Sequence, residues 1–541
     1  MAEMQQPQVP PILAHVIRAR AQAQGDFDVL TFVDIARDGS FIDETRTYAQ
    51  LWRRGCALAR ALTKKGVKAG DRFALIMQNH PEFVDAMVAA SILGAAFVPV
   101  DPRTKGNKLA YMLDFAECSG AIVADYAWAN LAEVLPRLGR LKWIAVLGAP
   151  GASADARVFV LKEAVDKSSS DGMEIASNDP DATMQLLYTS GTTGDPKAIV
   201  ATHRRFAEAG MLGLMLGLKN DDRLYTGLSL THANAQLITL GMAIQMGIRA
   251  VISRKFTKSR LWDITRRYSC TIFNLLGGMT VELYSQPPQK NDADNPVRMV
   301  LSAGMPAALW ENFAKRFGVQ IFEFYGAAEG GLTLNPPGVG PIGSVGKPPP
   351  NLELAILDDD GRPLPTGEPG EICFRPAAGG TASVRYLKND DASKKKTAQG
   401  WLHSGDIGHV DAAGWLYFHH RKGDEIRRNG EFISPGFVEK AIAEHSQVAD
   451  VCVYGIPAQS GAPGEKDVVA AIVPVDRAKF DPASVYAHCR RVLEANAVPS
   501  LLQVVSEIPK TASEKPQERI LRERLAAGGP DIYAAERAAA A

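Results

Sequence analysis

The sequence predicts an α/β protein with at least two domains, because the chain is long and its apolar segments alternate between two spacings. At 541 residues, the chain exceeds the size at which one hydrophobic core usually stops growing. Residues 73–77 and 96–100 are short apolar runs typical of strands, and residues 81–93 between them have apolar side chains at helical spacing. This alternation favours a large N-terminal domain of layered α/β sheets, in which most strands are parallel.

Two further regions follow the alternating part. Between residues 352 and 418, short apolar segments are separated by turns rich in Gly, Asp and Pro, which predicts a small antiparallel β-barrel or sheet. After Arg421, strands at residues 451–454 and 468–474 and a helix at residues 483–495 predict a smaller α+β domain. We therefore expect an N-terminal domain over residues 1–422 and a C-terminal domain over residues 423–541.

The composition is that of an ordinary globular protein and disfavours a nucleic-acid binder. The chain is 46% hydrophobic and 22% charged. Its 60 basic and 60 acidic side chains give a formal net charge of zero, whereas nucleic-acid-binding proteins usually have a basic excess or stripe. The short run Lys394-Lys395-Lys396 is interpreted as part of a solvated loop. No nucleic-acid partner is therefore expected.

The cysteines and the hydropathy pattern indicate a reduced, cytoplasmic protein. The six cysteines are scattered without a C-x-x-C pair, which disfavours both a zinc site and a disulfide framework. No run of about 18 apolar residues occurs, so no transmembrane segment is expected. The N-terminus also lacks the basic-then-apolar order of a signal peptide. Residues 210–218 are the most apolar short segment, and we expect them to form a buried helix.

The most informative segment is the ten-residue string from Tyr188 to Lys197, which predicts a phosphate-binding loop. Two glycines allow a tight bend, four Ser/Thr hydroxyls add donors, and a lysine supplies a positive charge. A polar turn of common composition is the alternative. The spacing is not that of a Walker A loop, and the apolar flanks at residues 184–187 and 198–201 predict a hairpin. The residues expected to contact phosphates are Thr189, Ser190, Gly191, Thr192, Thr193, Gly194 and Lys197.

This string resembles the phosphate loop of the adenylate-forming enzymes, which include acyl-CoA synthetases, peptide-synthetase adenylation domains and luciferases. Further resemblances follow in the family's order and cover nearly the whole chain. Residues 302–306 resemble the adenine-side loop, 324–329 the Y-G-x-T-E motif and 401–406 the W-x-x-T/S-G-D motif. Residues 421–435 resemble the hinge, and 511–515 resemble the C-terminal lysine motif. Within the family, the chain looks closest to CoA ligases of the crotonobetaine/carnitine type.

The resemblance implies ATP-dependent ligation of a carboxylic acid to coenzyme A. A carboxylate is a poor electrophile, so the family transfers it to the α-phosphate of ATP, which gives an acyl-adenylate and pyrophosphate. A thiol then displaces AMP. The expected cofactors and substrates are ATP, Mg²⁺, coenzyme A and a small carboxylic acid, and a homodimer is left open. Two alternatives remain: an adenylating enzyme that loads a carrier protein or another acceptor, and a nucleotide-binding protein without turnover.

The resemblance also implies roles for individual ATP-site residues. Glu329 is expected to hold Mg²⁺, a hard cation that favours oxygen ligands. Asp406 is expected to accept hydrogen bonds from both ribose hydroxyls, because a carboxylate is an acceptor only. Lys515 would stabilise charge on the α-phosphate from the C-terminal domain, and Tyr325 would lie against the adenine. The other residues expected at the nucleotide are Gly304, Met305, Gly326, Ala328 and Arg421.

The acid pocket and the coenzyme A tunnel follow from the same resemblance. His232 matches an aromatic or His position near the acyl group, and no Asp lies between residues 223 and 252 to bind an amino-acid ammonium. The paired glycines Gly277-Gly278 and Gly330-Gly331 predict a roomy pocket for a branched, cyclic or bulky acid; close packing at these glycines is the alternative. The other pocket residues are Asn234, Gln236, Met279 and Ala303, and the tunnel residues are Arg427, also expected to be catalytic, and Gly430.

Four positions depart from the family pattern. Ala198 and Glu514 stand where glycine is common. Ala328 replaces the usual Thr and removes one hydroxyl from the phosphate side. Gly423 occupies the hinge position that is usually Asp or Lys. Because glycine widens the accessible backbone angles, Gly423 should still allow rotation of the C-terminal domain.

Overall fold

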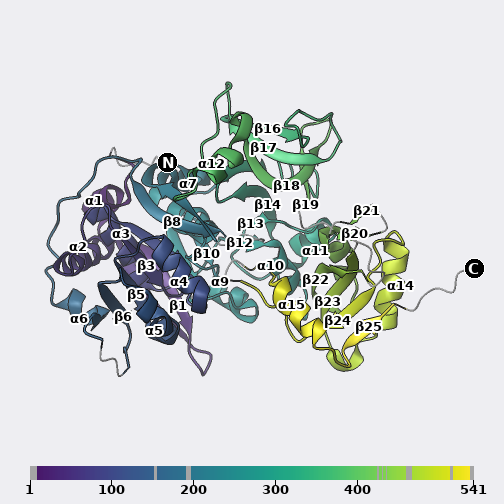
Figure 1. Cartoon of the computed structure of the whole chain (residues 1–541), viewed down its shortest axis with the longest axis horizontal. Coiled ribbons are helices and arrows are strands. Elements are labelled where there is room, and N and C mark those ends of the chain that lie inside the picture. Colours follow the sequence, from purple (N-terminus) through teal and green to yellow (C-terminus); the bar gives the residue numbers. More distant parts are fainter. Residues whose placement is uncertain are drawn as a thin grey trace, which may run out of the picture. The chain divides into compact units, whose positions relative to one another are not determined.

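The computed structural model describes residues 9–151, 155–189, 196–422, 426–428, 431–433, 435–458, 466–511, 514 and 516–535 (Figure 1). The chain forms two compact units. The first unit contains residues 1–257, 263–274 and 384–395, and the second contains residues 258–262, 275–383 and 396–541. The predicted domain boundary at residue 422 adjoins residues 423–425, which lie outside the described residues.

A seven-stranded sheet in the first unit confirms the predicted α/β alternation. Its order is β7-β6-β5-β3-β4-β8-β9, and all neighbours are parallel except β8 and β9. Helix α3 (Pro81–Leu93) begins with a proline in its first turn and ends at Gly94, whose φ of +63° suits a glycine. The strands are β3 (Arg72–Ile76), β4 (Ala96–Val100), β5 (Gly120–Ala124), β6 (Trp143–Leu147), β7 (Val158–Val160), β8 (Thr183–Thr189) and β9 (Lys197–Thr202).

Five more strands of the first unit form a second layer in the order β12-β10-β11-β1-β2. They are β1 (Asp28–Ile35), β2 (Phe41–Thr47), β10 (Arg223–Thr226), β11 (Arg249–Ser253) and β12 (Ile272–Leu276), whose last two residues belong to the second unit. The other helices that accompany the two sheets include α1 (Leu13–Gln24), α2 (Tyr48–Lys64), α4 (Gly106–Phe115), α5 (Trp128–Val134), α7 (His203–Met211) and α8 (Met242–Met246).

The expected buried helix at residues 210–218 is wrong. Helix α7 ends at Met211, and a short 3₁₀ turn covers residues 212–214. Leu214 and Met215 are about half exposed, at 52% and 48%. Gly217 then turns the chain with a φ of +68°. The segment is therefore the end of a helix rather than a buried helix of its own, and part of its apolar surface faces solvent. Within the described part of the chain, no helix is long and apolar enough to cross a membrane.

The second unit contains the predicted antiparallel region. Strands β16 (Leu352–Leu357), β17 (Gly370–Pro376), β18 (Leu402–Val410) and β19 (Leu416–Arg421) pair in sequence order as a four-stranded antiparallel sheet. The same unit contains β13 (Met299–Ala303), β14 (Gln320–Ala327) and β15 (Gly330–Asn335), with helices α10 (Gly277–Tyr284) and α11 (Ala307–Phe317). Of these strands, β13 and β14 are parallel, and β14 and β15 are antiparallel.

The C-terminal part of the second unit has the predicted α+β character. Its sheet has the order β22-β23-β24-β25, with β22 (Val448–Pro457), β23 (Lys466–Pro474), β24 (Leu501–Val504) and β25 (Ile532–Ala534). Helix α13 (Pro435–Ala443) packs on β22, and a buried core of Val, Ile and Leu side chains joins the sheet to α14 (Pro482–Val492). Helix α15 (Glu518–Ala526) contributes Leu521 to a second core cluster. A short pair, β20 (Ile426–Arg428) and β21 (Glu431–Ile433), precedes them.

Candidate active site

The predicted phosphate loop joins two antiparallel strands of the first unit, so the predicted hairpin is confirmed. Thr189 ends β8 opposite Lys197 at the start of β9, and the Thr189 hydroxyl lies 3.5 Å from the Lys197 carbonyl oxygen. Ser190, Gly191, Thr192, Thr193 and Gly194 lie outside the described residues, so their phosphate contacts stay a prediction. The Lys197 residue is exposed, and its ammonium lies 5.6 Å from the centre of the Tyr386 ring. The ammonium can therefore reach an anion at the mouth of the hairpin.

A buried glutamate that sequence reasoning missed holds the adenine-side loop. Both carboxylate oxygens of Glu323 accept backbone hydrogen bonds, one from Gly304 N at 2.5 Å and one from Met305 N at 3.1 Å. Burial raises the pKa of Glu323 to about 7, although these two N–H groups favour its charged form. The available signal was a single acidic side chain in the otherwise apolar run of residues 321–324.

Three residues that were predicted to bind the nucleotide meet in the second unit: Tyr325, Asp406 and Arg421. The Tyr325 hydroxyl donates to Asp406 Oδ2 at 2.6 Å. Asp406 and Arg421 are opposite each other in the backbone register of strands β18 and β19. Burial, followed by the charge of Asp406, raises the pKa of Tyr325 above its usual range, so the phenol stays a donor. The Tyr325 ring stacks on Phe374 with their centres 6.1 Å apart. Asp406 has lone pairs beyond the one that Tyr325 uses, which leaves acceptors for ribose hydroxyls.

The interpretation of Lys394-Lys395-Lys396 as a solvated loop is wrong in its conformation and for Lys396, although Lys394 and Lys395 are exposed as expected. The three lysines form the last turn of helix α12 (Asp390–Lys396), and Lys396 is partly buried. The Lys396 ammonium donates to the Ser404 carbonyl oxygen at 2.9 Å, two residues before Asp406. Burial lowers the pKa of Lys396, and the nearby Glu329 carboxylate opposes this shift most strongly. Lys396 is therefore a second residue at the site that sequence reasoning missed.

Glu329 lies in the turn between β14 and β15, directly after Ala328. Its carboxylate acts electrostatically on Lys396, and so does the carboxylate of Asp406. The carboxylate is partly buried and belongs to the turn that follows the Tyr325-Gly326 segment. A single carboxylate ligand fits Mg²⁺, which usually binds one or two carboxylates together with substrate phosphates and waters.

The predicted acid-pocket residues of the first unit lie at the start of an unusual helical segment. His232 and Asn234 are partly buried, and Asn234 accepts a hydrogen bond from the Asn274 amide. Residues 235–241 then form a π-helical segment, a rare conformation that is frequent at functional sites. Gln236 is fully buried, and its amide donates to the Leu230 carbonyl oxygen at 2.6 Å. Gln236 therefore supports the turn that carries His232.

Close packing explains two of the four glycines that were expected to leave room for the acid. A Cβ at Gly277 would lie 2.7 Å from the Gly304 carbonyl oxygen, so this glycine lets helix α10 approach the adenine-side loop. A Cβ at Gly331 would lie 2.6 Å from the Phe374 ring. Gly330 has a φ of +140°, which disfavours other residues. Of the neighbouring pocket residues, Met279 is buried and Ala303 is partly buried. The predicted free volume is thus not supported at Gly277 or Gly331.

The remaining predicted residues lie at the C-terminal part of the second unit. Gly423, Gly430 and Lys515 lie outside the described residues, and only the backbone of Arg427 is described, in β20. Sequence reasoning missed an ion cluster close to Lys515 in the chain. The Lys510 ammonium binds the carboxylates of Glu282 on α10 and of Asp450 on β22, the latter at 2.8 Å. Because all three side chains are less than a fifth exposed, this cluster fixes the start of the segment that contains Lys515.

Comparisons with known proteins agree with these motifs. The family model of AMP-binding enzymes matches residues 17–381, and that of the AMP-binding enzyme C-terminal domain matches residues 438–515. A medium/long-chain-fatty-acid–CoA ligase, FadD17 of Mycobacterium marinum (strain ATCC BAA-535 / M), is 31% identical over 91% of this chain and 93% of its own. The crotonobetaine/carnitine–CoA ligase of Salmonella paratyphi B (strain ATCC BAA-1250 / SPB7) is 29% identical over 87% of this chain and 91% of its own.

A solved structure shows the same fold. The anthranilate CoA ligase AuaEII, in complex with anthranoyl-AMP, superposes with a TM-score of 0.83 at 24% identity. The alignment covers 95% of this chain and 98% of that one. Since the family model covers well over half of the sequence and the first relative is aligned over nearly all of it, the chain belongs to the AMP-binding enzyme family.

Proposed function

We propose that this chain is an AMP-forming acid–CoA ligase. In the first half-reaction, a carboxylate oxygen attacks the α-phosphorus of ATP and pyrophosphate leaves. In the second, the thiol of coenzyme A attacks the acyl carbon, AMP leaves with the electron pair of the broken C–O bond, and the thiol proton passes to solvent. The observation that carries the proposal is the convergence of Tyr325, Asp406 and Arg421 in one unit, at three motifs that lie far apart in the sequence.

The described residues would act mainly by holding the nucleotide. Asp406 accepts the ribose hydroxyls while Tyr325 fixes the orientation of its carboxylate. Gly304 donates its backbone N–H to Glu323 and has a φ of +99°, which suits a glycine. Because glycine has no side chain, the backbone can approach the base at this position. Mg²⁺ held by Glu329 would neutralise phosphate charge, and Lys197 would add a second positive charge from the hairpin. Such fixed charges lower the barrier by aligning and stabilising the reacting phosphate.

The names of the relatives support coenzyme A as the acceptor of the acyl group. The relatives at 31% and 29% identity are both named as CoA ligases. Loading of a carrier protein uses the same adenylation chemistry and remains the alternative. A panel of carboxylic acids, scored by pyrophosphate release with and without coenzyme A, tests the proposal. We expect acid-dependent release that coenzyme A accelerates, together with an acyl-CoA product. Absence of release with every acid would contradict enzymatic turnover.

The acid itself is expected to be branched, cyclic or otherwise bulky rather than acetate. Gly278 lies in the first turn of α10, next to a glycine that close packing already explains. If the missing side chain of Gly278 leaves room for the acid, Gly278→Leu should lower the activity on the preferred acid and raise the relative use of smaller acids. Apolar pockets discriminate by about 1–3 kcal/mol per methylene, so a change of roughly tenfold in the ratio of kcat/KM values is expected.

Gly277→Ala provides the contrast. Its Cβ would press on the Gly304 carbonyl oxygen, so this variant should lower the use of ATP equally for all acids. Steady-state kinetics with a series of acids of increasing size measures both variants. If the wild type were fastest on acetate, or if Gly278→Leu left the acid profile unchanged, the assignment of Gly278 to the pocket would be wrong.

A further inference from the structure

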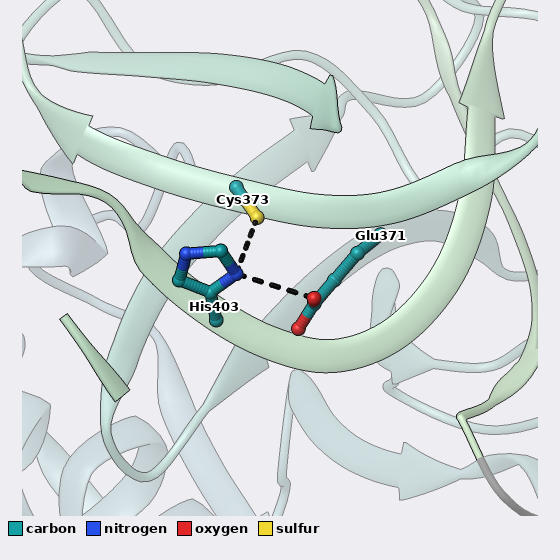
Figure 2. Close-up of side chains that lie close together, drawn as sticks. All are labelled: Glu371, Cys373 and His403. Atoms are coloured by element: carbon teal, nitrogen blue, oxygen red, sulfur yellow. Dashed lines mark hydrogen bonds and ion pairs between the residues drawn. The ribbon is translucent and has the colours of Figure 1, made fainter. Parts of the chain in front are cut away.

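Three side chains from neighbouring strands meet beside residues 404–406, a bulge in strand β18 that carries Asp406. Figure 2 shows Glu371 and Cys373 on one strand and His403 on the next, with the His403 ring between the other two side chains. His403 Nδ1 lies 3.2 Å from Glu371 Oε2 and 3.5 Å from Cys373 Sγ. The second carboxylate oxygen, Glu371 Oε1, accepts the backbone N–H of Gly405 at 3.0 Å. Glu371 therefore bonds both the residue before Ser404 and the residue after it.

The hydrogen bonds of Glu371, Cys373 and His403 account for the arrangement of these side chains without a metal ion, although Glu, Cys and His are metal-ligating residue types. An ionised carboxylate has no proton to give, so His403 Nδ1 must carry the proton that it shares with Glu371. Burial, followed by the charge of Glu371, raises the pKa of Cys373 to about 12, so the thiol stays protonated at neutral pH. Each of the two carboxylate oxygens already accepts one bond. The cluster thus has the properties of a hydrogen-bonded support.

The bulge has a backbone conformation that hydrogen bonds from neighbouring residues hold in place. Gly405 has a φ of +79°, and a Cβ built on it would meet nothing within 4 Å. The space where its side chain would stand is open, so the hydrogen bonds of its backbone contribute to positioning it. Its N–H is bound by Glu371, and its carbonyl oxygen accepts from Lys422 N at 2.8 Å. The Ser404 hydroxyl binds Asp406 N at 2.9 Å. The position of the Asp406 carboxylate therefore depends on the Glu371 carboxylate.

We infer that Glu371 is a positioning residue for recognition of the nucleotide ribose, with His403 as the donor that orients its carboxylate. This inference rests on the proposed role of Asp406 at the ribose. In Glu371→Gln, the side-chain amide keeps one acceptor but turns its NH₂ group toward either Gly405 N–H or His403 Nδ1–H. Either a donor then faces a donor, or the His403 ring moves its proton to Nε2, which is buried and has no partner among the described residues. Both outcomes weaken the support of the bulge, so Asp406 holds the ribose hydroxyls less well.

The test compares ATP with 2′,3′-dideoxy-ATP as substrates for pyrophosphate release. The ribose hydroxyls take no part in attack on the α-phosphorus, so the analogue reports only on their recognition. Because a hydrogen bond to a charged group contributes about 1.5–3 kcal/mol, the wild type should prefer ATP by at least roughly tenfold in kcat/KM. In Glu371→Gln we expect kcat/KM to fall about tenfold for ATP and less than twofold for the analogue. His403→Gln should shift the preference in the same direction by a smaller factor.

Glu353→Gln is the matched control. Glu353 lies on β16 of the same sheet and pairs with Arg375 at 2.6 Å, and both side chains are about one-third exposed. This variant should leave the preference for ATP unchanged. An equal loss with both nucleotides in Glu371→Gln and His403→Gln, or no loss in either, would overturn the inference. A wild type that uses both nucleotides equally well would instead refute the ribose role of Asp406, and with it the inference. Absence of any pyrophosphate release would refute the proposed function itself.

Discussion

Lys515→Ala is expected to lower acyl-adenylate formation by roughly two to three orders of magnitude, because a donor that stabilises transition-state charge is lost. Thioester formation from a supplied acyl-adenylate should stay largely intact. The reason is the predicted mobility of the C-terminal domain, by which one lysine carried on it would serve only one of the two half-reactions. The ion cluster of Lys510 with Glu282 and Asp450 gives this expectation a structural basis, since it anchors the chain five positions before Lys515.

Single-turnover assays of the two half-reactions measure this effect separately. Lys479→Ala is a suitable control, because Lys479 lies in the same C-terminal region but is 84% exposed and pairs with Asp476 on its own turn. It should leave both half-reactions unchanged. Equal losses in the two half-reactions of Lys515→Ala would contradict the assigned role and would indicate a general effect on the C-terminal region.

Asp406→Ala is expected to raise the KM for ATP far more than the KM for the acid. Two hydrogen bonds from ribose to a charged acceptor would be lost, at about 1.5–3 kcal/mol each if they are well shielded from water. The Tyr325 hydroxyl would also lose its carboxylate acceptor. Steady-state kinetics with ATP and the acid varied in turn provides the measurement.

Tyr325→Phe separates the two contributions to that effect. It removes the hydroxyl that binds Asp406 Oδ2 but retains both carboxylate oxygens and the stacked ring. Its effect on the KM for ATP should therefore be smaller, at about tenfold or less. An unchanged KM for ATP in Asp406→Ala, or an equal rise for the acid, would show that Asp406 does not hold the nucleotide.

Local sequence signals were sufficient to predict the elements whose ends are set by residues close by in the chain. Helix α3 and strand β4 have the bounds that the sequence predicts, because a proline in the first turn and a left-handed glycine delimit the helix. The hairpin around the phosphate loop was also predictable, since apolar runs flank a Gly- and Thr-rich turn. In contrast, residues 210–218 are apolar throughout, so hydrophobicity gave no sign of the turn at Gly217.

The supporting residues of the site were beyond the reach of sequence patterns, because they act across the fold. Glu371 binds a backbone group 34 residues away, and Lys510 binds Glu282 across 228 residues. Lys396 belongs to a run of lysines that composition alone assigns to solvent, and only the fold brings it to Ser404. Likewise, the reason for a glycine at position 277 is the carbonyl oxygen of Gly304, which lies on another element. Such pairings follow from tertiary structure and have no local signature.

The most direct test of the account follows the oxygen atoms of the acid. If the carboxylate attacks the α-phosphorus of ATP, one carboxylate oxygen must leave with AMP when coenzyme A displaces it. With an acid labelled with ¹⁸O in both carboxylate positions, together with ATP, Mg²⁺ and coenzyme A, mass spectrometry should find one ¹⁸O atom in AMP and none in pyrophosphate. Label in inorganic phosphate with ADP as the nucleotide product, or unlabelled AMP beside a labelled acyl-CoA, would contradict an acyl-adenylate intermediate.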